Sequence, residues 1–152
     1  MDNWEANLLV DDEPIRELLA NSRRIAVLGI KPESRSHKPA FQVPRFLQEK
    51  GYEIVPVPVY YPDVTEILGQ PIYRKLVDIP GDVDLVNVFR KTQDIPPHVP
   101  DIIAKKPRAV WFQLGIRNDT AAARLAKAGI LVVQDRCTAM EYGAIDQTRG
   151  NR

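Results

Sequence analysis

The chain of 152 residues is poor in the residue types that build disulfide frameworks and metal centres, with one cysteine and two histidines. Cys137 alone cannot form an internal disulfide, and two histidines are too few to make a structural zinc site expected. Neither sign of charge is in excess, because the chain has 21 basic and 20 acidic residues and a net charge of +1. Binding to nucleic acid through bulk charge is therefore not expected.

Long apolar runs are also absent. None approaches the roughly 20 residues needed to span a bilayer, and the acidic start of the chain has no signal-peptide pattern. We therefore expect a cytoplasmic protein without a membrane partner. Hydrophobic residues make up 44% of the chain, which at this length predicts a single domain over residues 1–152 with its own core.

The sequence does contain a regular alternation of short apolar runs and helix-like segments. The apolar runs predict strands over residues 25–28, 53–57, 85–89, 109–113 and 130–134. The segments with helical spacing predict helices over residues 11–22, 41–50, 97–104 and 119–128. Pro44 is expected close to the start of the second helix, because proline suits a first turn. The polar residues 143–152 are expected to form a disordered tail.

This alternation predicts an α/β fold, a Rossmann-like, doubly wound parallel sheet with helices on both faces. Numbered along the chain, the strands are expected in the order 3-2-1-4-5. The winding would then reverse between strands one and four, and such sheets bind ligands outside the carboxyl ends of the strands at this switch point. The loops that follow the strands are therefore the candidate site.

The loop after the first strand carries the strongest signal. The sequence RIAVLGIKPESRSHK, residues 24–38, passes from a buried strand through Gly29 into a polar and basic loop before a helix. Backbone N–H groups at a helix start, together with Arg35 and Lys38, suit a ligand with several phosphates. A solvated basic loop without a ligand is the alternative.

The same loop lacks the GxGxxG fingerprint of dinucleotide-binding proteins. The second strand also ends in prolines, where an acidic residue would be expected to bind a ribose. Both observations disfavour an ordinary NAD(P)-binding oxidoreductase or NAD(P) sensor, which stays an alternative.

The loops after the third and fourth strands add further candidates. Arg90 directly follows an apolar strand, where it would face a ligand or, alternatively, pair with a surface acid. Phe89 and Ile95 would form an apolar wall for a base or a pantetheine arm, with core packing as the alternative for Phe89. Gln113 can hydrogen-bond a ligand amide, and Gly115 allows close approach of the backbone.

The loop after the fifth strand places Cys137 beside Arg136. A neighbouring cation favours the thiolate, although most lone cysteines are buried and inert. No catalytic set is found, because His37 and His98 have no evident nucleophile or carboxylate partner. A binding protein is therefore expected rather than an enzyme.

Four segments, agreeing in order and spacing, resemble one known family. They read IAVLGIKPESRSHKPAFQVPRFLQEKGYEIVPV, EILGQPIYRKLVDIPGDVDLVNVFRK, AVWFQLGIRNDTAAARLAKAGILVVQDRC and MEY. The chain resembles, over residues 15–142, the small stand-alone CoA-binding proteins. Their fold is similar to the N-terminal CoA-binding domain of the succinyl-CoA synthetase α subunit.

The resemblance implies that coenzyme A lies across the carboxyl ends of the strands. It assigns to the ADP phosphates Gly29, Ile30, Ser34, Arg35 and Lys38. It assigns to the flank of the nucleotide Pro58, Val59 and Tyr60. It assigns to the adenine or pantetheine path Val88, Phe89, Arg90 and Ile95. It assigns to the switch point and the thiol end Gln113, Gly115, Arg136 and Cys137.

The chain departs from the family pattern after the second strand. Family members often have Asn-Pro there, where this chain has Pro58-Val59, so a hydrogen bond from that Asn to the adenosine is missing. The synthetase also needs a second domain with an active-site histidine and a partner subunit. These 152 residues are too few to hold that domain, so we do not expect a complete acyl-CoA ligase.

The expected function is non-catalytic binding of coenzyme A or a short acyl-CoA, as a carrier, a sensor or a regulatory module in acyl-CoA metabolism. The first alternative is a thiol-redox protein that forms a mixed disulfide between Cys137 and CoA. The second is the NAD(P)-binding protein described above. A homodimer, or docking to a larger acyl-CoA enzyme, is a further expectation.

Overall fold

A computed structural model describes residues 3–150 of the chain, of which residues 146–150 are described by their backbone alone. The strands of the main sheet are β1 (Arg24–Leu28), β2 (Glu53–Val57), β5 (Leu85–Val88), β6 (Ala109–Phe112) and β7 (Leu131–Val133). The helices are α1 (Asp12–Asn21), α2 (Pro39–Glu49), α3 (Val99–Lys105), α4 (Asp119–Lys127) and α5 (Thr138–Gly150). A small hairpin pairs β3 (Glu66–Ile67) with β4 (Gln70–Pro71). Single 3-10 turns cover Trp4–Asn7, Glu33–Arg35, Leu76–Asp78, Thr92–Asp94 and Pro96–His98.

The main sheet is parallel, with its strands in the order β2-β1-β5-β6-β7. The predicted fold class, a doubly wound parallel sheet, is confirmed, but the predicted strand order is wrong. The third strand of the main sheet along the chain is β5, and it lies between the first, β1, and the fourth, β6. The winding therefore reverses between β1 and β5.

The physical reason for this order is the burial of the strands. Every residue of β5 is buried, so β5 needs a neighbour on each side. Pro56 in β2 has no N–H to give to a second neighbour, and a strand with such a gap belongs at an edge. The free side of β2 is instead bound by a loop, in which the N–H of Tyr73 donates to the carbonyl of Pro56 at 3.0 Å.

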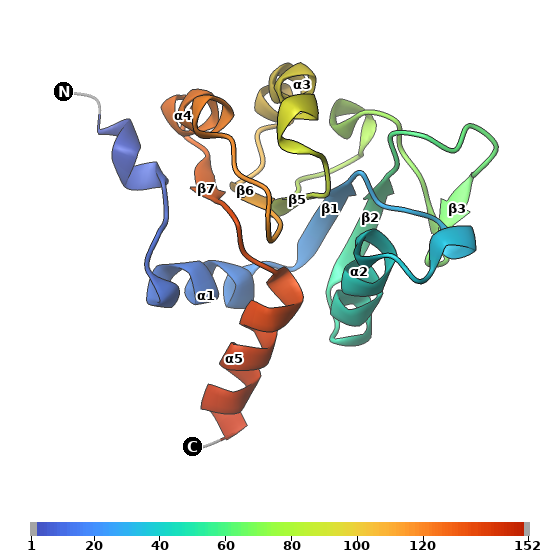
Figure 1. Cartoon of the computed structure of the whole chain (residues 1–152), viewed down its shortest axis with the longest axis horizontal. Coiled ribbons are helices and arrows are strands. Elements are labelled where there is room, and N and C mark those ends of the chain that lie inside the picture. The colour runs from blue at the N-terminus through green and yellow to red at the C-terminus, as the bar shows by residue number, and fades with distance from the viewer. Residues whose placement is uncertain (1–2, 151–152) are drawn as a thin grey trace.

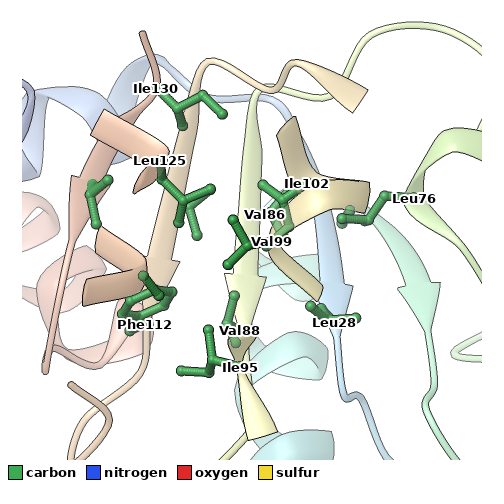
Figure 2. Packing of buried hydrophobic residues seen from close by; sticks show 14 of the residues in the cluster. Leu28, Leu76, Val86, Val88, Ile95, Val99, Ile102, Phe112, Leu125 and Ile130 are labelled. Atoms are coloured by element: carbon green, nitrogen blue, oxygen red, sulfur yellow. The ribbon is translucent and has the colours of Figure 1, made fainter. Parts of the chain in front are cut away.

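Helices cover the sheet on both faces, with α3 and α4 on one side and α1, α2 and α5 on the other (Figure 1). The side chains of β1 alternate between the two resulting cores, as a pleated strand requires. Ala26 and Leu28 lie in the core under α3 and α4, while Ile25 and Val27 lie in the other. Figure 2 shows part of the first core, with residues of α3 and α4 packed against β5 and β6.

Helix α2 begins at Pro39, five residues before Pro44, and Pro44 lies inside the helix. The expectation that the helix begins close to Pro44 is therefore wrong. A proline inside a helix leaves the carbonyl four residues earlier without its usual donor. That carbonyl, on Ala40, accepts instead from the N–H of Lys31 at 3.1 Å. The proline thus ties the loop after β1 to the first turn of α2.

The tail, for which the sequence predicts disorder, continues helix α5 as far as Gly150, and residues 151–152 lie outside the described part of the chain. Tyr142 anchors the helix, since its ring meets those of Phe46 and Tyr52 edge to face, with centroids 5.8 and 5.9 Å apart. Such pairs stabilise packing beyond their buried area. Among the described residues, no helix combines the length and the apolar character needed to cross a membrane.

Candidate functional site

A cavity of about 770 Å³ opens at the carboxyl edge of the sheet. It extends from the loop after β2, past the ends of β1 and β5, to the loops after β6 and β7. The first turn of α2 forms part of its wall. This is the edge at which doubly wound sheets bind ligands, and the reversal of winding between β1 and β5 lies under its centre.

The cavity brings together nine of the residues predicted for the site, which are Gly29, Ile30, Lys38, Val59, Tyr60, Phe89, Arg90, Gln113 and Cys137. The other seven predicted residues do not line it. Ser34 and Arg35 lie exposed in the 3-10 turn after β1, and Pro58 and Gly115 stand next to lining residues. Val88 and Ile95 are buried in the core under α3, where they contact other side chains (Figure 2).

Arg136 is the seventh, and its side chain is engaged with the N-terminal segment. The guanidinium donates to Asp12 at 2.7 Å, to Glu141 at 3.2 Å and to the carbonyl of Val10 at 3.0 Å. The hydrogen bond to Asp12 is the main cause that raises the pKa of Arg136, and the same bond lowers the pKa of the Asp12 carboxyl. Arg136 therefore joins α1 to α5 and does not face the cavity that Cys137 lines.

Basic side chains gather around the cavity. Lys31, Lys38, Arg90 and Lys91 line it together with one carboxylate, that of Asp94. The Arg90 guanidinium is 3.9 Å from Asp94, and its Nε is buried without a hydrogen-bond partner among the described residues. The Arg90 side chain as a whole is 28% exposed, so its positive charge is accessible beside those of the lysines. The cavity thus favours an anionic ligand with several oxygen acceptors.

Gly29 forms the floor of the cavity, where β1 and β5 end side by side. Its φ angle is +88°, and a Cβ atom at this position would lie 2.3 Å from the carbonyl oxygen of Phe89. The N–H of Gly29 donates to Val57, and the N–H of Phe89 donates to Leu28. The backbone therefore passes so close to the end of β5 that only glycine fits.

A buried polar network lies beneath the cavity, next to Cys137. The amide nitrogen of Gln113 donates to Asn87 at 2.6 Å and to the hydroxyl of Thr138 at 2.8 Å, and Asn87 also donates to Thr138 at 3.2 Å. All three side chains are buried. The amide nitrogen of Gln113 is thus engaged within the protein. Only the side-chain carbonyl oxygen of Gln113 could make the predicted hydrogen bond with a ligand amide.

Half of the residues that line the cavity were not predicted from the sequence. The missed residues are Lys31, Pro39, Ala40, Val43, Tyr61, Lys91, Asp94, Leu114 and Ile116. Several directly follow a predicted site residue, so counting every residue of each strand-end loop would have found Lys31, Lys91 and Leu114. The signal for the polar network was Asn87, a lone amide in an otherwise apolar strand.

The fold and this site define the chain as a doubly wound α/β protein with a cleft lined by basic residues at the carboxyl edge of its parallel sheet. Comparison with known families matches residues 23–143 to the CoA-binding domain. The chain belongs to the CoA-binding domain family.

Two similar proteins match most of this chain. The uncharacterized protein YneT of Bacillus subtilis (strain 168) is 35% identical over 125 residues, which is 81% of this chain and 87% of YneT. A solved structure from Thermus thermophilus, cell-free ID.343, is 36% identical, with a TM-score of 0.81 over 90% of this chain and 99% of that chain. The family is thus also represented by short chains of this length.

The same fold occurs within much longer proteins. The dinucleotide-forming acetyl-coenzyme A synthetase 1 of Ca. Korarchaeum cryptofilum matches 76% of this chain with a TM-score of 0.62. The sequences are 20% identical and the match covers 26% of the synthetase. This likeness concerns the fold alone.

Substitution of Gly29 tests the close approach at the cavity floor. We expect Gly29→Ala to lower the free energy of unfolding by clearly more than the roughly 1 kcal/mol that alanine costs at a positive φ. Gly115→Ala is the matched control, because Gly115 has a φ of +84° but open space where a Cβ atom would stand. Urea unfolding of both variants measures the difference, and equal losses would contradict the close approach.

Substitution of Thr138 tests the buried network. Thr138→Val keeps the shape of the side chain but removes the acceptor shared by Gln113 and Asn87. We expect a loss of about 1–3 kcal/mol in the free energy of unfolding, the usual cost of leaving buried donors unpaired. Thr138→Ser retains the hydroxyl and should recover most of the loss. A valine variant as stable as the wild type in chemical denaturation would show that the network contributes nothing.

Proposed function

We propose that this protein binds coenzyme A or a short acyl-CoA non-covalently in the cavity and catalyses no reaction by itself. The observation that carries the proposal is that basic side chains, those of Lys31, Lys38, Arg90 and Lys91, line the cavity at the carboxyl edge of the sheet. Coenzyme A carries a pyrophosphate and a 3′-phosphate, which supply the oxygen acceptors that such a site needs. Membership of the CoA-binding domain family supports this choice of anion.

The phosphates are proposed to lie at the start of α2. Lys38 directly precedes this helix of 11 residues, and Lys38, Pro39 and Ala40 line the cavity. Pro39 has no N–H, and the N–H of Phe41 donates to Lys38. The attraction for a phosphate therefore rests mainly on the partial positive charge of the helix start and on the lysine side chains. Lys31 is held against the same turn through its bond to Ala40.

The two ends of the cavity differ in their lining. An aromatic end is formed by Val59, Tyr60 and Tyr61 after the edge strand β2. The opposite end is formed by Gln113 and Cys137. We place the adenosine at the aromatic end and the pantetheine thiol at the other, with the apolar lining along the arm between them.

The proposal extends to the biological setting. We propose a carrier, a sensor or a regulatory module that works in acyl-CoA metabolism in the cytoplasm. A homodimer, or docking on a larger acyl-CoA enzyme, is part of the same proposal. Only the docking option has a supporting observation, which is that the fold also occurs within a much longer acetyl-coenzyme A synthetase.

Calorimetric titration with CoA tests the binding. We expect binding by the wild type and an affinity about tenfold weaker for Lys38→Ala, since a charge-assisted hydrogen bond contributes about 1.5–3 kcal/mol. Lys50→Ala is the matched control, because Lys50 lies at the opposite end of α2 and loses the same charge. No binding of CoA at millimolar concentration, or tighter binding of NAD(P) than of CoA, would overturn the proposal.

A second candidate function follows from Cys137, which is partly exposed and lines the cavity. Its thiolate could attack the disulfide of oxidised CoA. One S–S bond breaks, a new one forms between Cys137 and CoA, and the second CoA leaves as a thiolate. This step would make the protein a thiol-redox protein.

Mass spectrometry after incubation with CoA disulfide tests this exchange. We expect an added mass of one CoA that survives denaturation and is removed by a reductant. Cys137→Ser should abolish the adduct while leaving the calorimetric affinity for reduced CoA within about twofold, since serine is close in size. An adduct on the serine variant, or none on the wild type, would refute the redox function.

A further inference from the structure

Two adjacent tyrosines form the aromatic end of the cavity. The rings of Tyr60 and Tyr61 meet edge to face with centroids 5.2 Å apart, and both residues line the cavity. Tyr60 is 72% exposed, and the neighbouring Val59 is 41% exposed. Large apolar groups at the rim of a cavity mark a surface that a ligand covers.

The backbone that carries these rings is in an unfavourable conformation. Tyr61 has a φ of +66°, in the left-handed region that bulky residues rarely adopt. It also precedes Pro62, and a residue before proline prefers extended backbone. A conformation of this kind persists only where the surrounding structure holds it.

The side chain that holds it is Arg74. Its Nη1 donates to the carbonyl of Tyr60 at 2.8 Å, and its Nη2 donates to the carbonyls of Tyr61 at 2.8 Å and Val64 at 3.2 Å. The N–H of Val64 closes the same turn on Tyr61 at 3.2 Å. A planar guanidinium suits this arrangement because its donors keep a fixed geometry. Arg74 itself does not line the cavity.

The segment around Arg74 is fixed to the body of the protein. The preceding N–H, of Tyr73, donates to Pro56 on the edge of β2. Two residues further on, the N–H of Leu76 donates to the Asp101 carboxylate of α3 at 2.8 Å, and the Leu76 side chain is fully buried. Arg74 therefore connects the loop that carries Tyr60 and Tyr61, the tyrosine loop, to a segment that is fixed to β2 and α3.

We propose that Arg74 is a positioning residue that holds Tyr60 and Tyr61 as an aromatic wall, and that this wall selects ligands with a planar base at this end of the cavity. The inference rests on the proposed binding of CoA. Aromatic rings at a rim stack on a base of any identity. In this chain, stacking would supply what the residues after β2, Pro58 and Val59, cannot supply by side-chain hydrogen bonds.

The test compares ligands that share or lack the base. Affinities for CoA, adenosine 3′,5′-bisphosphate and 4′-phosphopantetheine are measured by calorimetry for the wild type, Arg74→Ala, Tyr60→Ala and the double variant. We expect Arg74→Ala to weaken CoA and the bisphosphate about three- to tenfold, as loss of one aromatic contact does, and to leave 4′-phosphopantetheine unchanged. The double variant should lose less affinity for CoA than the sum of the two single losses, because both changes act on the same wall.

Two further variants control for charge and geometry. Arg108→Ala removes the same charge from an exposed arginine just before β6, at the amino ends of the strands and away from the cavity, and should change no affinity. Arg74→Lys keeps the charge but not the planar fork, and should fall between wild type and Arg74→Ala. Equal losses for all three ligands, or additive effects in the double variant, would overturn the inference.

Hydrogen exchange separates this inference from the proposed function. In the ligand-free protein, Arg74→Ala should speed exchange of the Val64 amide, which closes the turn on Tyr61. If the wild type binds no CoA, the proposed function fails. Faster exchange in Arg74→Ala would then still support the role of Arg74 in holding the tyrosine loop. If CoA binds but exchange and affinity are unchanged by Arg74→Ala, the inference alone fails.

Discussion

The close passage of the backbone at Gly29 against the carbonyl of Phe89 is the constraint on which the site depends. Here β1 and β5 end next to each other, and the chain leaves them toward opposite faces of the sheet. The segment after β1 leads to α2, and the segment after β5 leads to α3 on the other face (Figure 1). Because the two segments diverge, a crevice opens above the floor. The basic residues of the cavity all lie on these two segments or at the start of α2.

The shape of the crevice is maintained by contacts outside it. A proline inside α2 frees the Ala40 carbonyl, which anchors Lys31 on one wall. Arg74 holds the tyrosine loop on the edge beside β2. Under the far end, Gln113 joins the end of β6 to the start of α5 through Thr138. Together these contacts preorganise a site before any ligand arrives, which lowers the ordering cost of binding.

Much of this arrangement could be predicted from local sequence patterns. Strand β2 has the predicted bounds, Glu53–Val57, and Asn118 caps α4 as a polar residue before an alanine-rich helix should. The order of the strands could not be predicted in the same way, because alternation fixes parallel pairing but not which strands become neighbours. Pro56 did contain that information, since it favours an edge position for β2.

The site residues also fall into two groups, those that a local pattern predicts and those that depend on long-range contacts. Residues directly after a strand, such as Gly29, Arg90 and Gln113, were found because the carboxyl edge of a parallel sheet is defined by the fold class. Arg136 also follows a strand, yet its guanidinium binds Asp12, which is 124 residues away in the chain. Long-range partners of this kind leave no local pattern, and neither does the fork that joins Arg74 to the tyrosine loop.

A crystal structure of the protein with coenzyme A bound would test the central claim most directly. We expect phosphate oxygens in hydrogen-bond contact with Lys38 and with the guanidinium of Arg90, a base against Tyr60, and the thiol toward Cys137. Coenzyme A bound at another surface, or with its phosphates away from the first turn of α2, would contradict it.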